Sequence, residues 1–187
     1  MRKPSARILK RLLSYNPSTG QLTWRERPNW MFKRHHYTNE RETFARIWNS
    51  KHAGKPAFTS VNADGYHQGQ IFKSLFRAHR VIACMMTGDW PSRQVDHLNG
   101  DRADNRWENL RLVSREQNMR NAKLYANNTS GVVGVCWLKR ERSWLARIGT
   151  GKKSIVLGYF KEFDDAVEAR KAAEIKYGYH KNHGRAA

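Results

Sequence analysis

The side chains best suited to chemistry lie between residues 95 and 121, where the chain reads VDHLNGDRADNRWENLRLVSREQNMRN. Asp96 and His97 are adjacent there, and Asn109 and Asn118 follow. A neutral imidazole, with an ordinary pKa of about 6.5, can take a proton from water at neutral pH. Carboxylate and amide oxygens are hard ligands of the kind that divalent ions such as Mg²⁺ prefer. Residues of these types can support hydrolysis beside a metal ion.

Two strands and a helix would have to bring these four side chains together. A short apolar lead-in ends at the Asp-His pair, and Asn99-Gly100-Asp101 is typical of a turn. Residues 109–113 predict a second short strand. Ser114 is suited to cap a helix, because Gln117 stands at capping-box spacing from it. This order predicts that the side chains converge from two strands and the first turns of a helix.

This stretch resembles the HNH nuclease motif, the ββα-metal fold, as found in phage and intron-encoded homing endonucleases. The resemblance covers residues 76–121, with the helix Ala78-His79-Arg80-Val81-Ile82, the Asp96-His97 pair, Asn109-Leu110-Arg111 and Asn118. It implies that Asp96 and Asn118 bind the metal. It also implies that His97 activates water and that Asn109 orients His97.

The reaction implied by the resemblance is Mg²⁺-dependent hydrolysis of DNA phosphodiesters, with Mn²⁺ a plausible substitute ion. The expected products carry 5′-phosphate and 3′-hydroxyl ends. One active site per chain would nick one strand. A double-strand break needs a homodimer on DNA or two sequential visits, and the sequence leaves both open.

Two other functions compete with this interpretation. A lone Asp-His pair in a loop is usually only a solvated turn, and a non-catalytic DNA-binding regulator with a vestigial nuclease fold would keep the same elements. An RNA-binding ribosomal or structural protein would share the charge. His79 lies on an apolar helix, where a core role is more probable than metal ligation. The sequence also indicates turn roles for Asp101 and Asn105.

The composition restricts the kind of molecule that the protein can be expected to bind. The chain has 187 residues, with 35 Lys and Arg against 16 Asp and Glu, and a formal net charge of +19. Hydrophobic residues make up 39%, including seven Trp, which argues against a disordered basic tail. A folded chain with this charge indicates a polyanionic partner, and double-stranded DNA is the first candidate.

Cysteine and apolar content restrict the compartment. Two cysteines exclude a disulfide scaffold and a four-cysteine zinc site, and they fit a reducing cytoplasm, that of a bacterial host if the protein is phage-encoded. No apolar run approaches the roughly 20 residues that a membrane span needs. Lys10 and Arg11 interrupt the apolar N-terminal stretch, which is therefore not expected to be a signal peptide.

The pattern along the chain predicts an α+β protein of small modules. We expect a basic α/β region at residues 1–70, the nuclease core at 71–123, a linker at 124–130 and a sheet-plus-helix module at 131–182. Helices are predicted at residues 4–14, 44–51 and 78–86. The second of these is expected to turn Phe44, Ile47 and Trp48 inward.

The N-terminal region has no catalytic motif, but it holds a stretch of mixed basic and aromatic residues. This stretch could extend a DNA-binding track or could be a solvated loop, and both alternatives stay open. Its members are Trp24, Arg25, Arg27, Trp30, Lys33, Arg34, His35, His36 and Tyr37.

Residues 128–182 resemble the DNA-binding domain of plant ethylene-response factors, which also occurs fused to HNH nucleases. The resemblance rests on Gly134-Val135, on residues 144–148, on Leu157-Gly158-Tyr159-Phe160 and on the helix from Asp165. It implies a three-stranded antiparallel sheet that enters the major groove, backed by a helix. Strands are expected at 132–139, 143–149 and 154–160, and the helix at 163–177.

Alternation predicts the two faces of this sheet. The residues expected to face the helix are Val135, Trp137, Trp144, Ala146, Ile148, Ile155 and Leu157. Those expected on the outer face are Cys136, Ser143, Leu145, Arg147, Ser154, Val156 and Tyr159.

The outer face departs from the plant family, because arginines and tryptophans that read bases there are mostly replaced by small or apolar residues. Basic residues gather instead in the turns and strand ends, where they can contact phosphates without reading sequence. The residues expected to bind DNA are Lys139, Arg140, Arg142, Arg147, Lys152, Lys153 and Tyr159. A solvated hairpin is the alternative. The remaining histidines, at 35, 36, 52, 67, 180 and 183, are expected at the surface or facing DNA.

Overall fold

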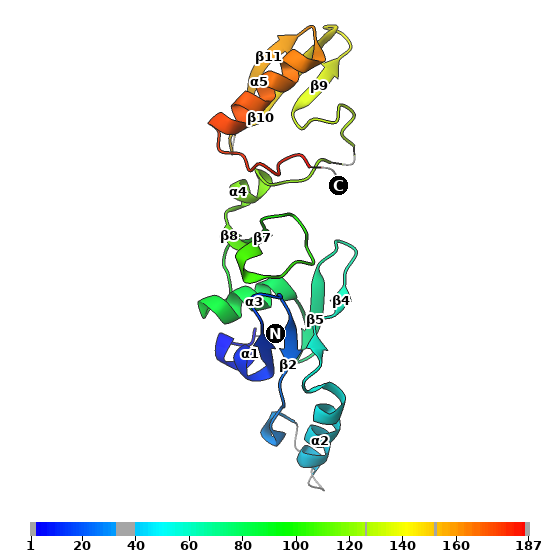
Figure 1. Ribbon diagram of the computed structural model, residues 1–187, viewed down its shortest axis with the longest axis vertical. Helices are drawn as coiled ribbons and strands as arrows, with labels where there is room; N and C mark the ends of the chain where they lie inside the picture. Colours follow the sequence, from blue (N-terminus) through cyan, green and yellow to red (C-terminus); the bar gives the residue numbers. More distant parts are fainter. Residues whose placement is uncertain (1–2, 33–39, 126, 152, 186–187) are drawn as a thin grey trace. The chain divides into compact units, whose positions relative to one another are not determined.

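The structure is a computed structural model that describes residues 3–32, 40–125, 127–151 and 153–185 (Figure 1). The chain divides into two compact units, Met1–Leu112 and Val113–Ala187, called here the first and the second unit. Each combines helices with small sheets, which confirms the α+β class. The finer domain boundaries expected from the sequence stay predictions. No helix in the described ranges is both long and apolar enough to cross a membrane.

The first unit opens with a helix followed directly by a hairpin. Helix α1 (Ala6–Leu12) is capped by the Ser5 hydroxyl and is followed by β1 (Leu13–Tyr15), β2 (Leu22–Trp24) and β3 (Pro56–Ala57), which form one antiparallel sheet. The helix ends two residues earlier than expected. Leu13 is already extended, because it pairs with Trp24 across the hairpin.

A second sheet leads into the most apolar helix of the unit. Strands β4 (Ser60–Val61), β5 (His67–Ile71) and β6 (Ser74–Arg77) are antiparallel, and α3 (Ala78–Thr87) follows β6 without a loop. Val81, Ile82 and Cys84 of α3 are fully buried and share one core with the leucines of α1. This common core joins residues before and after position 70 into one folded unit.

Helix α2 (Glu40–His52) packs through a different face from the one expected. Phe44 and Ile47 are 46% and 57% exposed, so the prediction that they face inward is wrong. Ala45 is buried instead, and the Trp48 ring packs edge-on against Trp24 at 5.6 Å. Helix α2 packs against β2 through this aromatic contact, which determines the face that is buried.

The strand that carries the Asp-His pair and the next strand along the chain form a two-stranded sheet of their own. These strands are β7 (Gln94–His97) and β8 (Leu110–Val113), and the short helix η2 (Trp107–Asn109) leads into β8. The turn between β1 and β2 lies against the intervening loop. The amide of Trp107 donates to the Pro17 carbonyl at 3.0 Å, and the Tyr15 hydroxyl donates to the Asn105 carbonyl at 2.8 Å. The N-terminal hairpin therefore supports the loop that carries the motif.

The second unit contains a short helix, a sheet and a long helix. Helix α4 (Arg115–Met119) begins with the predicted capping box between Ser114 and Gln117. Strands β9 (Val135–Leu138), β10 (Ser143–Gly149) and β11 (Ser154–Phe160) form an antiparallel sheet in the order β11-β10-β9. Helix α5 (Phe163–Lys176) packs against that sheet (Figure 1).

The sheet faces follow the predicted alternation, with a bulge on β11. The register shifts between Ala146 and Arg147, which lets Leu157 and Phe160 both pack on the core while Tyr159 points outward. Two positions differ from expectation. Trp137 is 44% exposed, because β9 is an edge strand, and Ser143 is 6% exposed. The structure offers no evident reason for the burial of Ser143.

A buried arginine connects helix α5, the sheet and the C-terminal tail. Arg170 is 2% exposed, and its guanidinium donates to the Arg147 carbonyl at 2.7 Å and pairs with Glu174 at 3.0 Å. A third nitrogen lies 3.2 Å from Nε2 of His183. His183 is 7% exposed, so the expectation of a surface position is wrong. A neutral imidazole can accept a hydrogen bond from the buried guanidinium, and this contact holds the tail against helix α5.

The close approach of the hairpin to the motif loop predicts different costs at two glycines. Both Gly20 and Gly54 have a φ near +75°. A Cβ on Gly20 would lie 2.6 Å from the carbonyl carbon of Asn105, whereas nothing lies within 4 Å of a Cβ on Gly54. Gly54→Ala should cost about 1 kcal/mol through backbone strain alone. Gly20→Ala should cost on the order of 3 kcal/mol. If urea unfolding showed the same loss of unfolding free energy in both variants, the close approach of Gly20 to Asn105 would be contradicted.

The buried histidine predicts a pH dependence of stability. Burial lowers the pKa of His183 to about 4, with Glu174 opposing the shift and Arg170 and Lys171 adding to it. The unfolded chain binds this proton near pH 6.5, so stability is complete above that pH and is lost as the pH falls toward 4. His183→Gln keeps an acceptor for Arg170 but does not titrate. Between pH 7.5 and 5, the melting temperature should fall less for this variant than for the wild type. If the melting temperatures of the two proteins fell in parallel with pH, His183 would not be the group responsible.

Candidate active site

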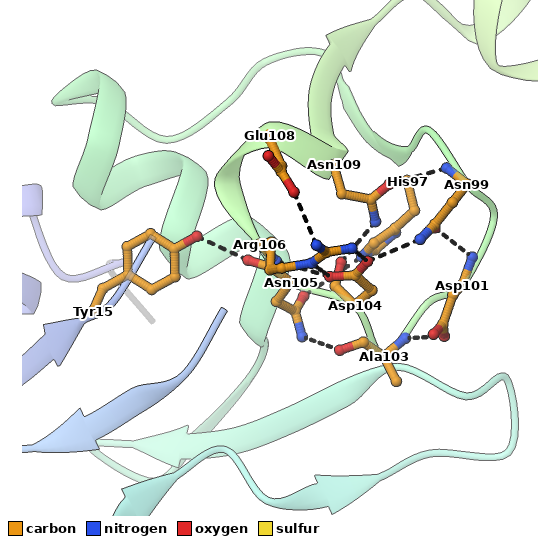
Figure 2. A network of polar contacts seen from close by, with 10 residues as sticks. All are labelled: Tyr15, His97, Asn99, Asp101, Ala103, Asp104, Asn105, Arg106, Glu108 and Asn109. Carbon is orange, nitrogen blue, oxygen red and sulfur yellow. Dashed lines mark hydrogen bonds and ion pairs between the residues drawn. The ribbon is translucent and has the colours of Figure 1, made fainter. Parts of the chain in front are cut away.

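The ring of His97 is buried at the end of β7. It is 3% exposed, and its Nε2 lies 3.5 Å from Oδ1 of Asn105, at the long end of hydrogen bonding. The amide of Asn105 is itself oriented, because its Nδ2 donates to the Ala103 carbonyl at 3.0 Å. Figure 2 shows these groups together within the loop that follows β7.

This arrangement favours one tautomer of the imidazole. Because Oδ1 of Asn105 can only accept, its contact favours the form with the proton on Nε2 of His97, in which Nδ1 is the basic nitrogen. Burial lowers the pKa of His97, against the Asn105 contact and the nearby carboxylates of Asp96, Asp101 and Asp104, which raise it. The ring is therefore neutral at neutral pH, the form that a general base requires.

Two aromatic side chains hold the other sides of this ring. His79 of α3 meets His97 edge-on at a centroid distance of 5.2 Å, and Tyr66 lies 4.8 Å from His79 and 5.9 Å from His97. His79 is 4% exposed, as expected for a core residue, and burial lowers its pKa to about 3. A neutral, packed His79 can restrict the orientation of His97 without adding charge beside it.

Asn109 bonds to the backbone of the loop. Its Oδ1 accepts from the Asn99 amide at 2.9 Å, and its Nδ2 donates to the Asp104 carbonyl at 2.8 Å. The Leu98 amide donates to the Asn109 carbonyl at 2.9 Å. These bonds fix the segment directly after His97. The role of Asn109 in orienting His97 stays a prediction, for which these backbone bonds supply an indirect route.

The loop is closed by charged side chains as well (Figure 2). Arg106 pairs with Asp104 at 2.7 Å and with Glu108 at 2.9 Å. The side-chain Nδ2 of Asn99 donates to Oδ2 of Asp104 at 2.8 Å. The hydrogen bonds from Arg106 lower the pKa of Asp104 to about 2. Asp101 accepts from the Ala103 amide, a turn role that matches the expectation. The loop therefore satisfies much of its own backbone without a large apolar core.

Asp96 precedes His97 and is the acidic side chain next to the buried ring. It is paired with Arg111 of β8, whose Nε and Nη2 lie 3.0 and 2.8 Å from Oδ2. This pair fixes the carboxylate, whose side chain is 12% exposed. Among the described residues, no group of three or more His, Cys, Asp or Glu side chains is arranged to hold a metal. One hard carboxylate still fits a loosely held Mg²⁺ that takes its other ligands from substrate phosphate and water.

Asn118 lies in the second unit, in helix α4. Its amide donates to the Ser114 carbonyl within that helix, so the side chain projects from a turn fixed by the capping box. The first unit brings Asp96, His97 and Asn109 together. Asn118 stays the predicted second metal ligand on the basis of motif spacing.

The residues expected to bind DNA occupy the sheet of the second unit and its turns. Arg147 and Tyr159 share the outer face, where Tyr159 is 61% exposed and Arg147 is also exposed. The exposed residues Lys139, Arg140, Arg142 and Lys153 lie in the turns that connect the strands. Lys152 lies outside the described residues. Contact with DNA stays a prediction for this set.

Sequence reasoning missed two residues around His97. The sequence predicts only a turn role for Asn105, and its Nδ2 does make a turn bond, but its side-chain oxygen faces His97. Tyr66 lies next to the histidines through the packing of distant strands. Asn105 could have been found as a second amide near the Asp-His pair, whereas Tyr66 has no local signal.

The comparisons with known proteins match one segment of the chain. Residues 76–120 match a family described as HNH endonuclease. Protein 3.8 of Escherichia phage T7 is 36% identical over 50 residues, which are 27% of this chain and 41% of that protein. No protein of known structure matches the chain. The family match extends from β6 to the end of α4, so it contains Asp96, His97, Asn109 and Asn118 within an HNH endonuclease segment.

Proposed function

We propose that this protein is a metal-dependent endonuclease that hydrolyses phosphodiester bonds of double-stranded DNA. The observation that carries the proposal is the buried, neutral imidazole of His97, aligned by Asn105 and adjacent to Asp96, inside the segment that matches the HNH endonuclease family. The charge of +19 supports a polyanionic substrate. A phage or intron-associated homing endonuclease is the biological role that we infer.

In the proposed reaction, His97 acts as the general base. Its Nδ1 takes a proton from a water molecule as the water oxygen forms a bond to phosphorus. The bond between phosphorus and the 3′ oxygen breaks, and that oxygen takes a proton from solvent. The water oxygen becomes part of the 5′-phosphate, and the 3′ oxygen becomes a hydroxyl. His97 later returns its proton to solvent, and no oxidation or reduction takes place.

Asp96 and Asn118 are the residues that would hold the divalent ion, with Mg²⁺ the proposed physiological ion and Mn²⁺ a substitute. When bound, such an ion neutralises phosphate charge and stabilises the developing charge on the leaving oxygen. Arg111 holds the carboxylate of Asp96 in place and contributes a second positive charge beside it. Asn109 positions the loop that follows His97.

The second unit would supply DNA binding through its sheet. Its outer face offers Arg147 and Tyr159, and cationic turns flank it. These turns are suited to phosphate contacts that do not read sequence. One active site per chain would nick one strand, and a homodimer on DNA or two sequential visits would cut both.

The first prediction concerns the proposed base. His97→Ala should lower nicking of supercoiled plasmid in Mg²⁺ by roughly 10²- to 10⁴-fold, because water loses its proton acceptor. EDTA should abolish nicking by the wild type. His52→Ala, which removes a histidine from α2, is the matched control and should keep full activity. Full nicking by His97→Ala would overturn the assignment, and DNA binding by a wild type that never nicks would favour a regulator.

The second prediction concerns Asn105 as a positioning residue. Asn105→Leu removes the acceptor at Nε2 of His97, whereas Asn105→Asp keeps one. We expect kcat to fall at least about tenfold in the leucine variant, because part of the imidazole then carries its proton on Nδ1. The aspartate variant should retain more activity. ¹⁵N correlation spectra of the His97 ring report the tautomer directly, and an unchanged tautomer in the leucine variant would contradict the role.

A further inference from the structure

A wide basic groove lies in the N-terminal part of the first unit, away from the Asp-His pair. Its volume is about 980 Å³. Helix α1, the end of β2 and helix α2 contribute to its wall. Its charged lining residues are Arg7, Lys10, Arg11, Arg25, Arg27, Glu26 and Glu42, five cations against two anions. We call it the N-terminal groove.

Helix α1 presents three of these cations as one exposed row. Arg7, Lys10 and Arg11 stand at helical i, i+3 and i+4 spacing, while Leu9 and Leu12 of the same helix are fully buried. Within the described residues, no acidic side chain lies at ion-pair distance from any of the three. From Arg7 to Arg11 the helix rises about 6 Å. A row of this length can face more than one phosphate of a strand, since phosphates follow at about 3.4 Å along the axis.

Several contacts hold Arg27 in the floor of the groove. The Arg27 guanidinium lies over the Trp24 and Trp48 rings at 5.0 and 3.8 Å, and its Nε is buried without a hydrogen-bond partner among the described residues. Asn49 bonds to both the amide and the carbonyl of Arg27, at 2.8 and 3.0 Å. Burial lowers the pKa of Arg27 to about 10, so it stays charged at neutral pH. A fixed guanidinium loses little freedom on binding an anion.

We propose that the N-terminal groove binds the sugar-phosphate backbone of duplex DNA, at a site separate from the catalytic loop. Guanidinium groups match phosphate oxygens in geometry and charge. The groove is far larger than one phosphate needs, which suits a length of strand. The choice of duplex DNA rests on the proposed function, whereas the polyanion site rests on the groove itself.

The β1–β2 hairpin lies between the two sites. Gly20 touches the backbone of Asn105 at one end of β2, and Arg25 lines the groove just beyond the other end. Strand β2 has three residues, which span about 10 Å. The groove and the catalytic loop are therefore separate sites at the two ends of one strand.

The test compares two triple variants of the full chain with equal loss of charge. The groove variant is Arg7→Gln/Lys10→Gln/Arg11→Gln. The control is Arg46→Gln/Lys51→Gln/Lys55→Gln, three exposed cations of the same unit outside the lining. Affinity for a labelled 30-base-pair duplex is measured by fluorescence anisotropy in EDTA, across a range of salt concentrations. Melting temperatures confirm that both variants fold.

We expect the groove variant to bind about tenfold more weakly or worse, and the slope of log affinity against log salt to fall by up to about 3, roughly 0.9 per lost phosphate contact. The control should change little. Equal losses of affinity in both variants would overturn the proposal, because the loss of charge alone would explain them. No loss of affinity in either variant would also overturn it. A larger loss with duplex RNA than with duplex DNA would overturn the choice of DNA.

The outcome separates this proposal from the nuclease proposal. Plasmid nicking by the wild type in Mg²⁺ is measured alongside. A wild type that never nicks, but whose DNA affinity depends on the groove, would retain the groove and reject the nuclease. If the wild type nicks plasmid and the groove variant binds DNA as tightly as the wild type, the nuclease proposal is retained and the groove proposal is rejected.

Discussion

The proposed chemistry depends on one contact, that between Nε2 of His97 and the side-chain oxygen of Asn105. An imidazole can remove a proton from water only through an unprotonated nitrogen, so its other nitrogen needs an acceptor. Asn105 can serve because its own amide is oriented by the Ala103 carbonyl. The Tyr15 hydroxyl and the close approach of Gly20 hold its backbone. These supports come from the loop itself and from the distant β1–β2 hairpin, so the alignment of His97 depends on the folding of the whole unit.

This dependence explains why residues 1–70 and the motif share one core. The loop between β7 and β8 is polar and satisfies itself through hydrogen bonds and the Asp104–Arg106 pair. Such a loop buries little apolar surface of its own, so its position has to come from outside. Helix α3 below it and the β1–β2 hairpin beside it supply that position. Stability and site geometry are therefore coupled within the first unit.

In the second unit a buried charge has the corresponding organising role. Arg170 lies where an apolar residue would be expected, yet each side of its guanidinium meets a partner: the Arg147 carbonyl, Glu174 and His183. Removing any partner would leave a buried charge incompletely paired, which costs far more than an exposed ion pair contributes. The tail that carries His183 is thereby held against the sheet, and the outer face with Arg147 and Tyr159 is left exposed.

The sequence by itself determined the elements and the motif. The apolar run at 78–86 predicted α3, and the helix expected at 163–177 is α5. The spacing of Ser114 and Gln117 predicted the capping box, and the run from Asp96 to Asn118 predicted the segment that matches the HNH endonuclease family. These features are local, because capping and amphipathic spacing involve residues a few positions apart. Tertiary structure alone decided the surroundings of His97, the burial of His183 and the shape of the N-terminal groove. Each arises from side chains far apart along the chain, such as Tyr15 with Asn105, and no spacing rule encodes contacts that only the folded core creates.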